Sequence, residues 1–277
     1  MINTIGKGLR KLSKIPYRLI KYSYWILSRR LVRIPMELVT DDLAFSFHPS
    51  GWNIYTSIIA DYEKNPEIEL RETQMFKFFN KDEVKSAAYT NDLLFLGDEV
   101  RGPRDQEYLF YLGTWPWGGM SETESMHGGT PYGIHYDRIE NKSTKELWGY
   151  GRNPFYDTTD IFPLEFEMNL TIDIYESIKR GYNPLYHNLF PSVVILLKEN
   201  GQYRAISRDG DHRVAALSMT GTKSFFAEIT YVIKEAEADD WYYVRNGFCS
   251  KEFALEIFDA YFKLNGRERL EYLSLDK

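Results

Sequence analysis

Cysteine is almost missing from this chain, and that scarcity limits what the protein can be. Cys249 is the single cysteine in 277 residues, so no disulfide can form within the chain. This indicates a reducing compartment or a fold that makes no use of its thiol. The five histidines show no zinc-ligand spacing such as His-Glu-x-x-His, and the pattern therefore disfavours structural zinc.

Acidic side chains are absent from the first 36 residues, which form a distinct basic leader. This leader holds nine Lys and Arg, whereas the rest of the chain holds 25 basic against 40 acidic residues. Ile and Leu recur there at helical spacing with most cations on the opposite face, and Pro16 divides the stretch into two expected helices. Long apolar runs are missing from the leader too. Its longest uncharged run, residues 22–28, is too short to span a bilayer.

The basic leader, residues 1–36, has three open interpretations. Its cationic and apolar faces suit an interfacial helix on an anionic membrane surface, which implies a cytoplasmic protein held peripherally at the inner face of the membrane. The same faces suit a helix packed on the acidic body of its own chain. An organellar transit peptide shares this Arg-rich, acid-poor composition.

Aromatic side chains are abundant in the chain as a whole, at 16% of residues within a hydrophobic share of 43%, and this composition predicts a folded protein. Residues 37–160 are expected to start with helices, one capped by Ser50 and ended by Pro66 and another over about 70–79. Residues 98–160 are rich in Gly, Pro, Trp and Tyr and are expected to be irregular. Such a long segment either lines a substrate pocket or caps the core.

Residues 161–232 predict a helix, a hairpin, a second helix and a further strand in that order. Apolar residues at spacing four indicate the first helix, which Gly181 ends. Asn200-Gly201 joins two β-rich runs and is typical of a hairpin turn. Residues 233–277 are expected to form a helical tail packed on this core, without chemistry of their own. The predicted fold class is mixed α/β with a small mixed sheet.

Charge is concentrated at one corner between the hairpin and the second helix, in the sequence Arg-Asp-Gly-Asp-His-Arg of residues 208–213. The first-turn amides of a helix favour an anion, and the glycine lets a phosphate approach the backbone. Arg213 can bind a phosphate bidentately, and His212 can relay a proton. Asp209 and Asp211 would repel a bare phosphate unless one holds a metal ion or a hydroxyl and the other caps the helix. Phosphoryl transfer suits this mixture, although a solvated turn with locally paired charges explains the same residues.

Residues 160–232 resemble the core of the ParB/sulfiredoxin-like superfamily, in which a hairpin leads into such a corner and then into a helix with Ala-Ala and a Gly. The resemblance covers less than a third of the chain. The motif of residues 209–213 is most similar to the Asp-Gly-His-His-Arg of the free-serine kinase branch, which it matches at four of five positions. That branch also carries a Pro-x-Glu before the preceding helix, and Pro163-Leu164-Glu165 stands at the matching place.

The resemblance implies a nucleotide-dependent phosphotransferase. In that case Glu165 is the base that deprotonates an acceptor hydroxyl, and Glu167 takes this role if the register differs. Asp209 orients the acceptor or binds Mg²⁺, and His212 assists the transfer. The residues implied to hold the phosphates of ATP, ADP or CTP are Arg208, Gly210, Asp211, His212 and Arg213.

Other branches of the superfamily fit this chain less well. Sulfiredoxins carry a catalytic cysteine where this chain has Asp211, which disfavours sulfinic acid reduction. ParB proteins also bind DNA, but a body with 25 basic and 40 acidic residues is a poor surface for nucleic acid, and this disfavours nuclease activity as well. The remaining alternative is a nucleotide-binding regulatory or scaffold module without catalysis.

The expected acceptor is a small molecule with a hydroxyl group, for which a sugar or glycan intermediate of polysaccharide synthesis at the membrane is one candidate. Aromatic rings of the irregular segment offer flat apolar faces on which a sugar ring can stack, although core packing would use the same rings. These residues are Trp115, Trp117, Tyr132, Tyr136 and Trp148.

We predict that deletion of residues 1–36 abolishes binding to vesicles of anionic lipid, because it removes both the apolar stripe and the nine cations. Cosedimentation measures the binding, and vesicles of neutral lipid are the control. The body should remain folded in this experiment. A truncated protein that unfolds would show instead that the leader belongs to the core.

Overall fold

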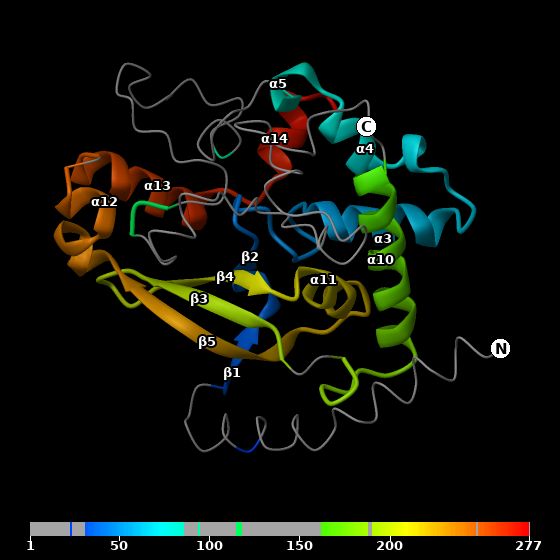
Figure 1. Ribbon diagram of the computed structural model, residues 1–277, viewed down its shortest axis with the longest axis horizontal. Helices are drawn as coiled ribbons and strands as arrows, with labels where there is room; N and C mark the ends of the chain where they lie inside the picture. Colours follow the sequence, from blue (N-terminus) through cyan, green and yellow to red (C-terminus); the bar gives the residue numbers. More distant parts are fainter. Residues whose placement is uncertain are drawn as a thin grey trace.

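The computed structural model describes residues 31–85, 162–187, 190–247 and 249–276, together with Ser23, Leu94 and residues 115–117. Within these ranges the chain forms the predicted mixed α/β fold around one five-stranded sheet (Figure 1). Its strands are β1 (Leu31–Pro35), β2 (Val39–Thr40), β3 (Ser192–Leu197), β4 (Tyr203–Asp209) and β5 (Ser224–Lys234). Its α-helices are α3 (Ile54–Lys64), α4 (Gln74–Phe79), α5 (Asp82–Lys85), α10 (Phe162–Lys179), α11 (Asp211–Met219), α12 (Tyr242–Arg245), α13 (Lys251–Lys263) and α14 (Arg267–Tyr272). Short 3-10 helices are η1 (Met36–Leu38), η2 (Leu70–Glu72) and η3 (Glu235–Asp240).

The sheet has the strand order β1-β5-β3-β4-β2 and mixes parallel with antiparallel pairs. β3 and β4 form the predicted antiparallel hairpin, in which Gly201 adopts a positive φ of 84°. β5 lies parallel to β3 and antiparallel to β1, and β2 lies parallel to β4 at the other edge. The antiparallel hairpin thus carries a parallel neighbour on each side.

Alternate side chains of the sheet enter two separate cores. Ala205 of β4 packs with residues of α3, α10 and α11, whereas the next residue, Ile206, packs with residues of α13. Figure 1 shows α3, α10 and α11 gathered on one side and α12 and α13 on the other. Because successive residues of a strand point to opposite faces, one strand can supply side chains to a different site on each face.

The helix α3 begins at Ile54 because the side chain of Asn53 accepts hydrogen bonds from the backbone N–H groups of Tyr55 and Thr56. The prediction that Ser50 caps this helix is wrong. The hydroxyl of Ser50 lies 2.7 Å from Nδ1 of His48 instead. Within the described ranges no helix combines the length and the hydrophobicity needed to cross a bilayer.

Two strands were not predicted, and one of them changes the boundary of the leader. β1 pairs along its whole length with β5, and Ile34 and Met36 are buried at 3% and 1% exposure. Residues 31–36 therefore belong to the folded body. A five-residue strand of this kind is completed only by a partner almost two hundred residues away, so local sequence carries little signal for it. Deletion of residues 1–36 would remove β1 together with the leader, so the prediction that the body stays folded holds only for a truncation that ends before Leu31.

Candidate functional site

The charged corner lies where β4 ends and α11 begins, as predicted. Gly210 connects the two elements with a φ of 99°, in the left-handed region that favours glycine. A Cβ atom at this position would lie 2.4 Å from Nη2 of Arg213, so the site also requires the absence of a side chain. The left-handed turn and the close approach of Arg213 together make glycine necessary here.

Arg213 folds back over this turn and is buried at 6% exposure. Its Nη1 donates to the backbone oxygen of His187 at 3.1 Å, and its Nη2 donates to Oδ2 of Asp209 at 3.4 Å. The side chain of Asp209 is 69% exposed. The expected phosphate ligand Arg213 is therefore engaged in holding the turn, while Asp209 presents its carboxylate to solvent.

Glu167 is the glutamate that meets the corner. Its Oε2 lies 2.7 Å from Nε2 of His212, and it is buried at 5% exposure where α10 packs against α11. The expected base, Glu165, is exposed on the same helix, two residues away. Because successive residues of an α-helix turn by about 100°, the two glutamates point in widely different directions. The structure thus brings together His212 and Glu167, the residue expected in an alternative register.

Tyr55 is the residue of this site that the sequence did not reveal. Its ring lies 4.4 Å from the ring of His212, centre to centre, and it is buried at 3% exposure. Burial raises the pKa of Tyr55 well above 10, and the negative charge of Glu167 raises it further. Tyr55 therefore stays protonated and forms an uncharged wall beside the His212–Glu167 pair.

Asp211, the first residue of α11, is directed into the protein. Burial raises its pKa to about 7, and the charge of Asp42 adds to this rise, although the nearby hydroxyl of Ser207 lowers it. Asp211 was expected to bind phosphate through its backbone amide. Because Asp211 is the first residue of α11, this amide has no partner within the helix and can take that role. Its carboxyl group is therefore a buried, partly protonated neighbour of the corner.

Asp41 forms a second buried carboxyl group near the corner. Its Oδ1 accepts hydrogen bonds from the backbone N–H groups of Leu43 and Phe45, and its Oδ2 accepts from the amide of Asn53. Burial outweighs these donors and raises the pKa of Asp41 to about 7. The sequence signal that could have indicated these buried carboxyl groups is the pair Asp41-Asp42 directly before residues 43–60, which contain no Asp, Glu, Lys or Arg.

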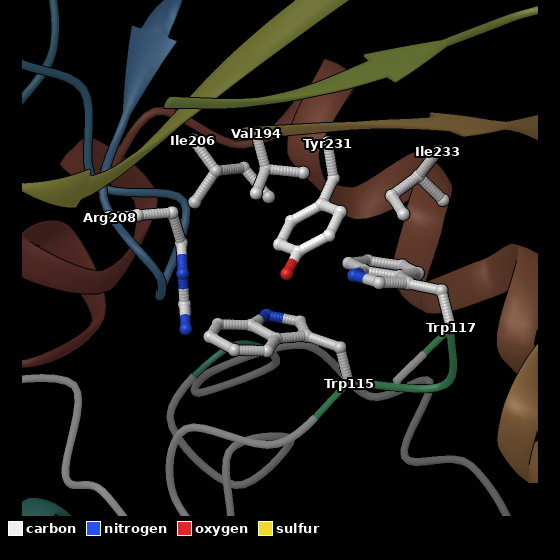
Figure 2. A pocket seen from close by; sticks show the side chains of 7 residues that line it. All are labelled: Trp115, Trp117, Val194, Ile206, Arg208, Tyr231 and Ile233. Carbon is white, nitrogen blue, oxygen red and sulfur yellow. The ribbon is translucent and has the colours of Figure 1, made fainter. Parts of the chain in front are cut away.

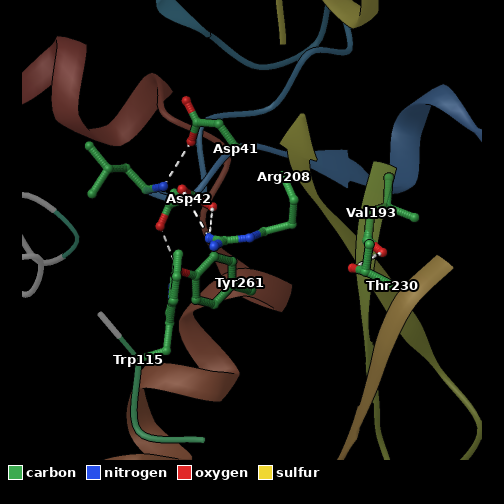
Figure 3. Close-up of polar contacts among 8 residues, drawn as sticks. Asp41, Asp42, Trp115, Val193, Arg208, Thr230 and Tyr261 are labelled. Carbon is green, nitrogen blue, oxygen red and sulfur yellow. Dashed lines mark hydrogen bonds and ion pairs between the residues drawn. The ribbon is translucent and has the colours of Figure 1, made fainter. Parts of the chain in front are cut away.

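Arg208 points to the opposite face of the sheet, away from His212. Its guanidinium stacks 4.3 Å from the ring centre of Trp115 and lines a pocket there (Figure 2). Figure 3 shows Nη1 of Arg208 directed at both carboxylate oxygens of Asp42, at 3.3 and 3.4 Å. Burial raises the pKa of Asp42 to about 6 despite this partner. The predicted phosphate ligands Arg208 and Arg213 thus lie in different surroundings.

The aromatic residues expected to stack a sugar are only partly described. Trp115 and Trp117 are buried at 5% and 9% exposure and pack against α13, where Nε1 of Trp115 donates to the hydroxyl of Tyr261. The other three, Tyr132, Tyr136 and Trp148, lie outside the described residues. Trp115 and Trp117 therefore pack in the core, as one of the two expectations had it, and they also line a small hollow, while stacking on a sugar stays a prediction.

Within the described part of the chain, no group of three or more His, Cys, Asp or Glu side chains is placed to hold a metal ion. No protein-family model matches the chain, and comparison with curated proteins and with solved structures yields no match either.

We predict that Gly210→Ala destabilises the protein more than Gly221→Ala does, by roughly 1–3 kcal/mol. Both glycines have a positive φ, so both substitutions carry the backbone cost of about 1 kcal/mol. Only at Gly210 would the new Cβ displace Arg213, since no atom lies within 4 Å of the position at Gly221. Urea denaturation measures the difference. Equal losses of stability would show that a Cβ atom at residue 210 does not displace Arg213.

We also predict that the free energy of unfolding falls as the pH rises from about 4 to about 7. Asp41 and Asp211 ionise near pH 4 when unfolded but only near pH 7 when folded, so the folded state binds more protons in this window. Each group contributes up to about 4 kcal/mol to the change. Denaturation at pH 5 and pH 8 measures the change in the free energy of unfolding. Asp211→Asn should reduce this dependence on pH, whereas Asp173→Asn, on the exposed surface, should leave it unchanged.

Proposed function

We propose that this protein is a nucleotide-dependent phosphotransferase that acts on a small hydroxyl acceptor. The observation that carries the proposal is the partly buried contact of 2.7 Å between Glu167 and His212 at the start of α11. A carboxylate beside an imidazole is a common arrangement for accepting a proton from a hydroxyl group. The resemblance of residues 209–213 to the free-serine kinase motif of the ParB/sulfiredoxin-like superfamily supports the same reaction.

The roles of the glutamates follow from their placement. Glu167 holds His212 through the hydrogen bond, and this pair takes the proton that the acceptor hydroxyl loses. Tyr55 limits water beside the pair because its ring packs against the imidazole. Glu165 is exposed to solvent on α10 and does not take part. The base is thus Glu167, the residue expected to take this role in the alternative register.

The residues at the corner fit a bound nucleotide and magnesium. The bound nucleotide supplies the phosphoryl group, which leaves its bridging oxygen and forms a new bond to the acceptor oxygen. Gly210 lets phosphate oxygens approach the first-turn amides of α11, and Arg213 keeps this turn in shape. Asp209 is an exposed carboxylate, and Mg²⁺ in such sites commonly takes one or two carboxylates together with phosphate oxygens and water.

The glutamates of α10 offer a matched test of this proposal. Glu167→Gln should lower the rate of phosphoryl transfer about 10²–10⁴-fold, because the amide cannot accept the proton. Binding of ATP, ADP or CTP should stay unchanged in the same variant, because Glu167 holds the imidazole and not the phosphates. Glu165→Gln should change neither quantity. Calorimetry measures the binding, and turnover of nucleotide with candidate hydroxyl acceptors measures the transfer.

Two results would contradict the phosphotransferase. Undiminished transfer in Glu167→Gln would show that Glu167 is not part of the base, provided that thermal unfolding shows the variant to be folded. Nucleotide binding without transfer to any acceptor in the unaltered protein would leave a regulatory or scaffold module. Arg213→Ala is a poor test of phosphate binding, because the substitution also breaks the contacts with His187 and Asp209 that hold the turn.

A further inference from the structure

A small apolar cluster lies at the β1 edge of the sheet, on the face opposite to α10 and α11. Phe225 of β5 packs with residues of those helices, so the next residue of the strand, Phe226, points the other way. The ring of Phe226 lies 6.3 Å from the ring of Phe190, centre to centre. Leu31 and Leu185 pack against the same Phe190. These four residues, Leu31, Leu185, Phe190 and Phe226, are called the outer patch.

The outer patch is only partly covered. Phe190 is 6% exposed, whereas Phe226 keeps 50% of its surface exposed. The loop that carries Leu185 also carries Tyr186, which is 49% exposed. An apolar cluster with such exposed rings often marks a surface that meets a membrane or another protein.

The chain enters the outer patch directly from the basic leader. Leu31 is both the first residue of β1 and a member of the patch. Residues 1–30, which precede it, hold eight Lys and Arg and no Asp or Glu. They also hold Ile and Leu at helical spacing, together with four aromatic residues, Tyr17, Tyr22, Tyr24 and Trp25. A basic and amphipathic segment is therefore tethered at the margin of an exposed apolar surface.

The charges beside the outer patch indicate which partner suits both the patch and the leader. On this face of β1 and β5 the charged side chains are Arg33 and Glu228, one of each sign. Arg33 is exposed, and its Nε donates to the hydroxyl of Ser224 at 2.7 Å. Such a face offers no excess of negative charge to the eight cations of residues 1–30, whereas a bilayer with anionic lipid does.

We propose that the outer patch rests on an anionic membrane surface together with residues 1–30. The eight cations supply the electrostatic attraction, and Phe226 enters the boundary between headgroups and acyl chains. The patch adds a contact from the folded body to the contact made by the leader, so the protein binds with one fixed face toward the bilayer. This docking surface does not depend on the phosphotransferase chemistry.

The outer patch and the charged corner share one loop, residues 181–187. Leu185 of this loop packs on Phe190, and the backbone oxygen of His187 accepts a hydrogen bond from Nη1 of Arg213. A bilayer that meets the patch therefore lies near the corner as well. An acceptor held at the membrane can reach the corner in this orientation.

Two half-exposed rings provide a matched pair of variants. Phe226→Ala should lower the affinity for vesicles of phosphatidylglycerol and phosphatidylcholine about fivefold, because an apolar ring no longer enters the bilayer. Tyr272→Ala should leave the affinity unchanged, because Tyr272 is 47% exposed on α14, which lies at the opposite end of Figure 1 from β1. Cosedimentation measures the affinity, and thermal unfolding confirms that both variants are folded.

The variant Phe226→Trp shows what covers the outer patch. Brominated lipid in the same vesicles should quench more of its fluorescence than that of the unaltered protein. Unchanged affinity in Phe226→Ala, or no additional quenching in Phe226→Trp, overturns the proposal. Additional fluorescence that is blue-shifted without vesicles, and that shifts to the red when residues 1–28 are removed, overturns it too, because the leader then covers the patch. Neither measurement uses nucleotide, so such results leave the phosphotransferase intact.

Discussion

The left-handed turn at Gly210 is the constraint on which the arrangement of the candidate site depends. It converts the end of β4 into the start of α11 within one residue, and Arg213 closes over it because no side chain is present there. The turn places His212 and Asp211 on the face covered by α10, while Arg208 remains on the other face. A different backbone at this position would separate the imidazole from Glu167.

Burial of carboxyl groups around this turn carries a cost that the fold only partly offsets. The pKa values of Asp41, Asp42 and Asp211 are all raised by burial, although each has hydrogen-bond donors or a cation beside it. Groups of this kind reduce stability at neutral pH, and they are found more often at functional sites than elsewhere. Their gathering at the end of β2 and the start of α11 supports the choice of this corner as the site.

The strand β4 links the corner to the aromatic pocket. Consecutive residues of a strand face opposite sides, so Ser207 lies toward the helices and Arg208 toward Trp115. The proposed proton transfer takes place on the face that α10 and α11 cover. The predicted set of phosphate ligands combined residues from both faces because the sequence alone does not tell how far Arg208 and Arg213 lie apart.

Local signals in the sequence determined the hairpin at Asn200-Gly201, the helices α10, α11 and α13, and the corner at residues 208–213, because turn residues, capping and helical spacing act over a few positions. Tertiary structure alone decided the strand β1, the contact of Glu167 rather than Glu165 with His212, and the position of Tyr55 beside them. Each of these depends on partners distant in the chain. A helix shows which residues share a face, but only its packing against α11 decides which face meets His212.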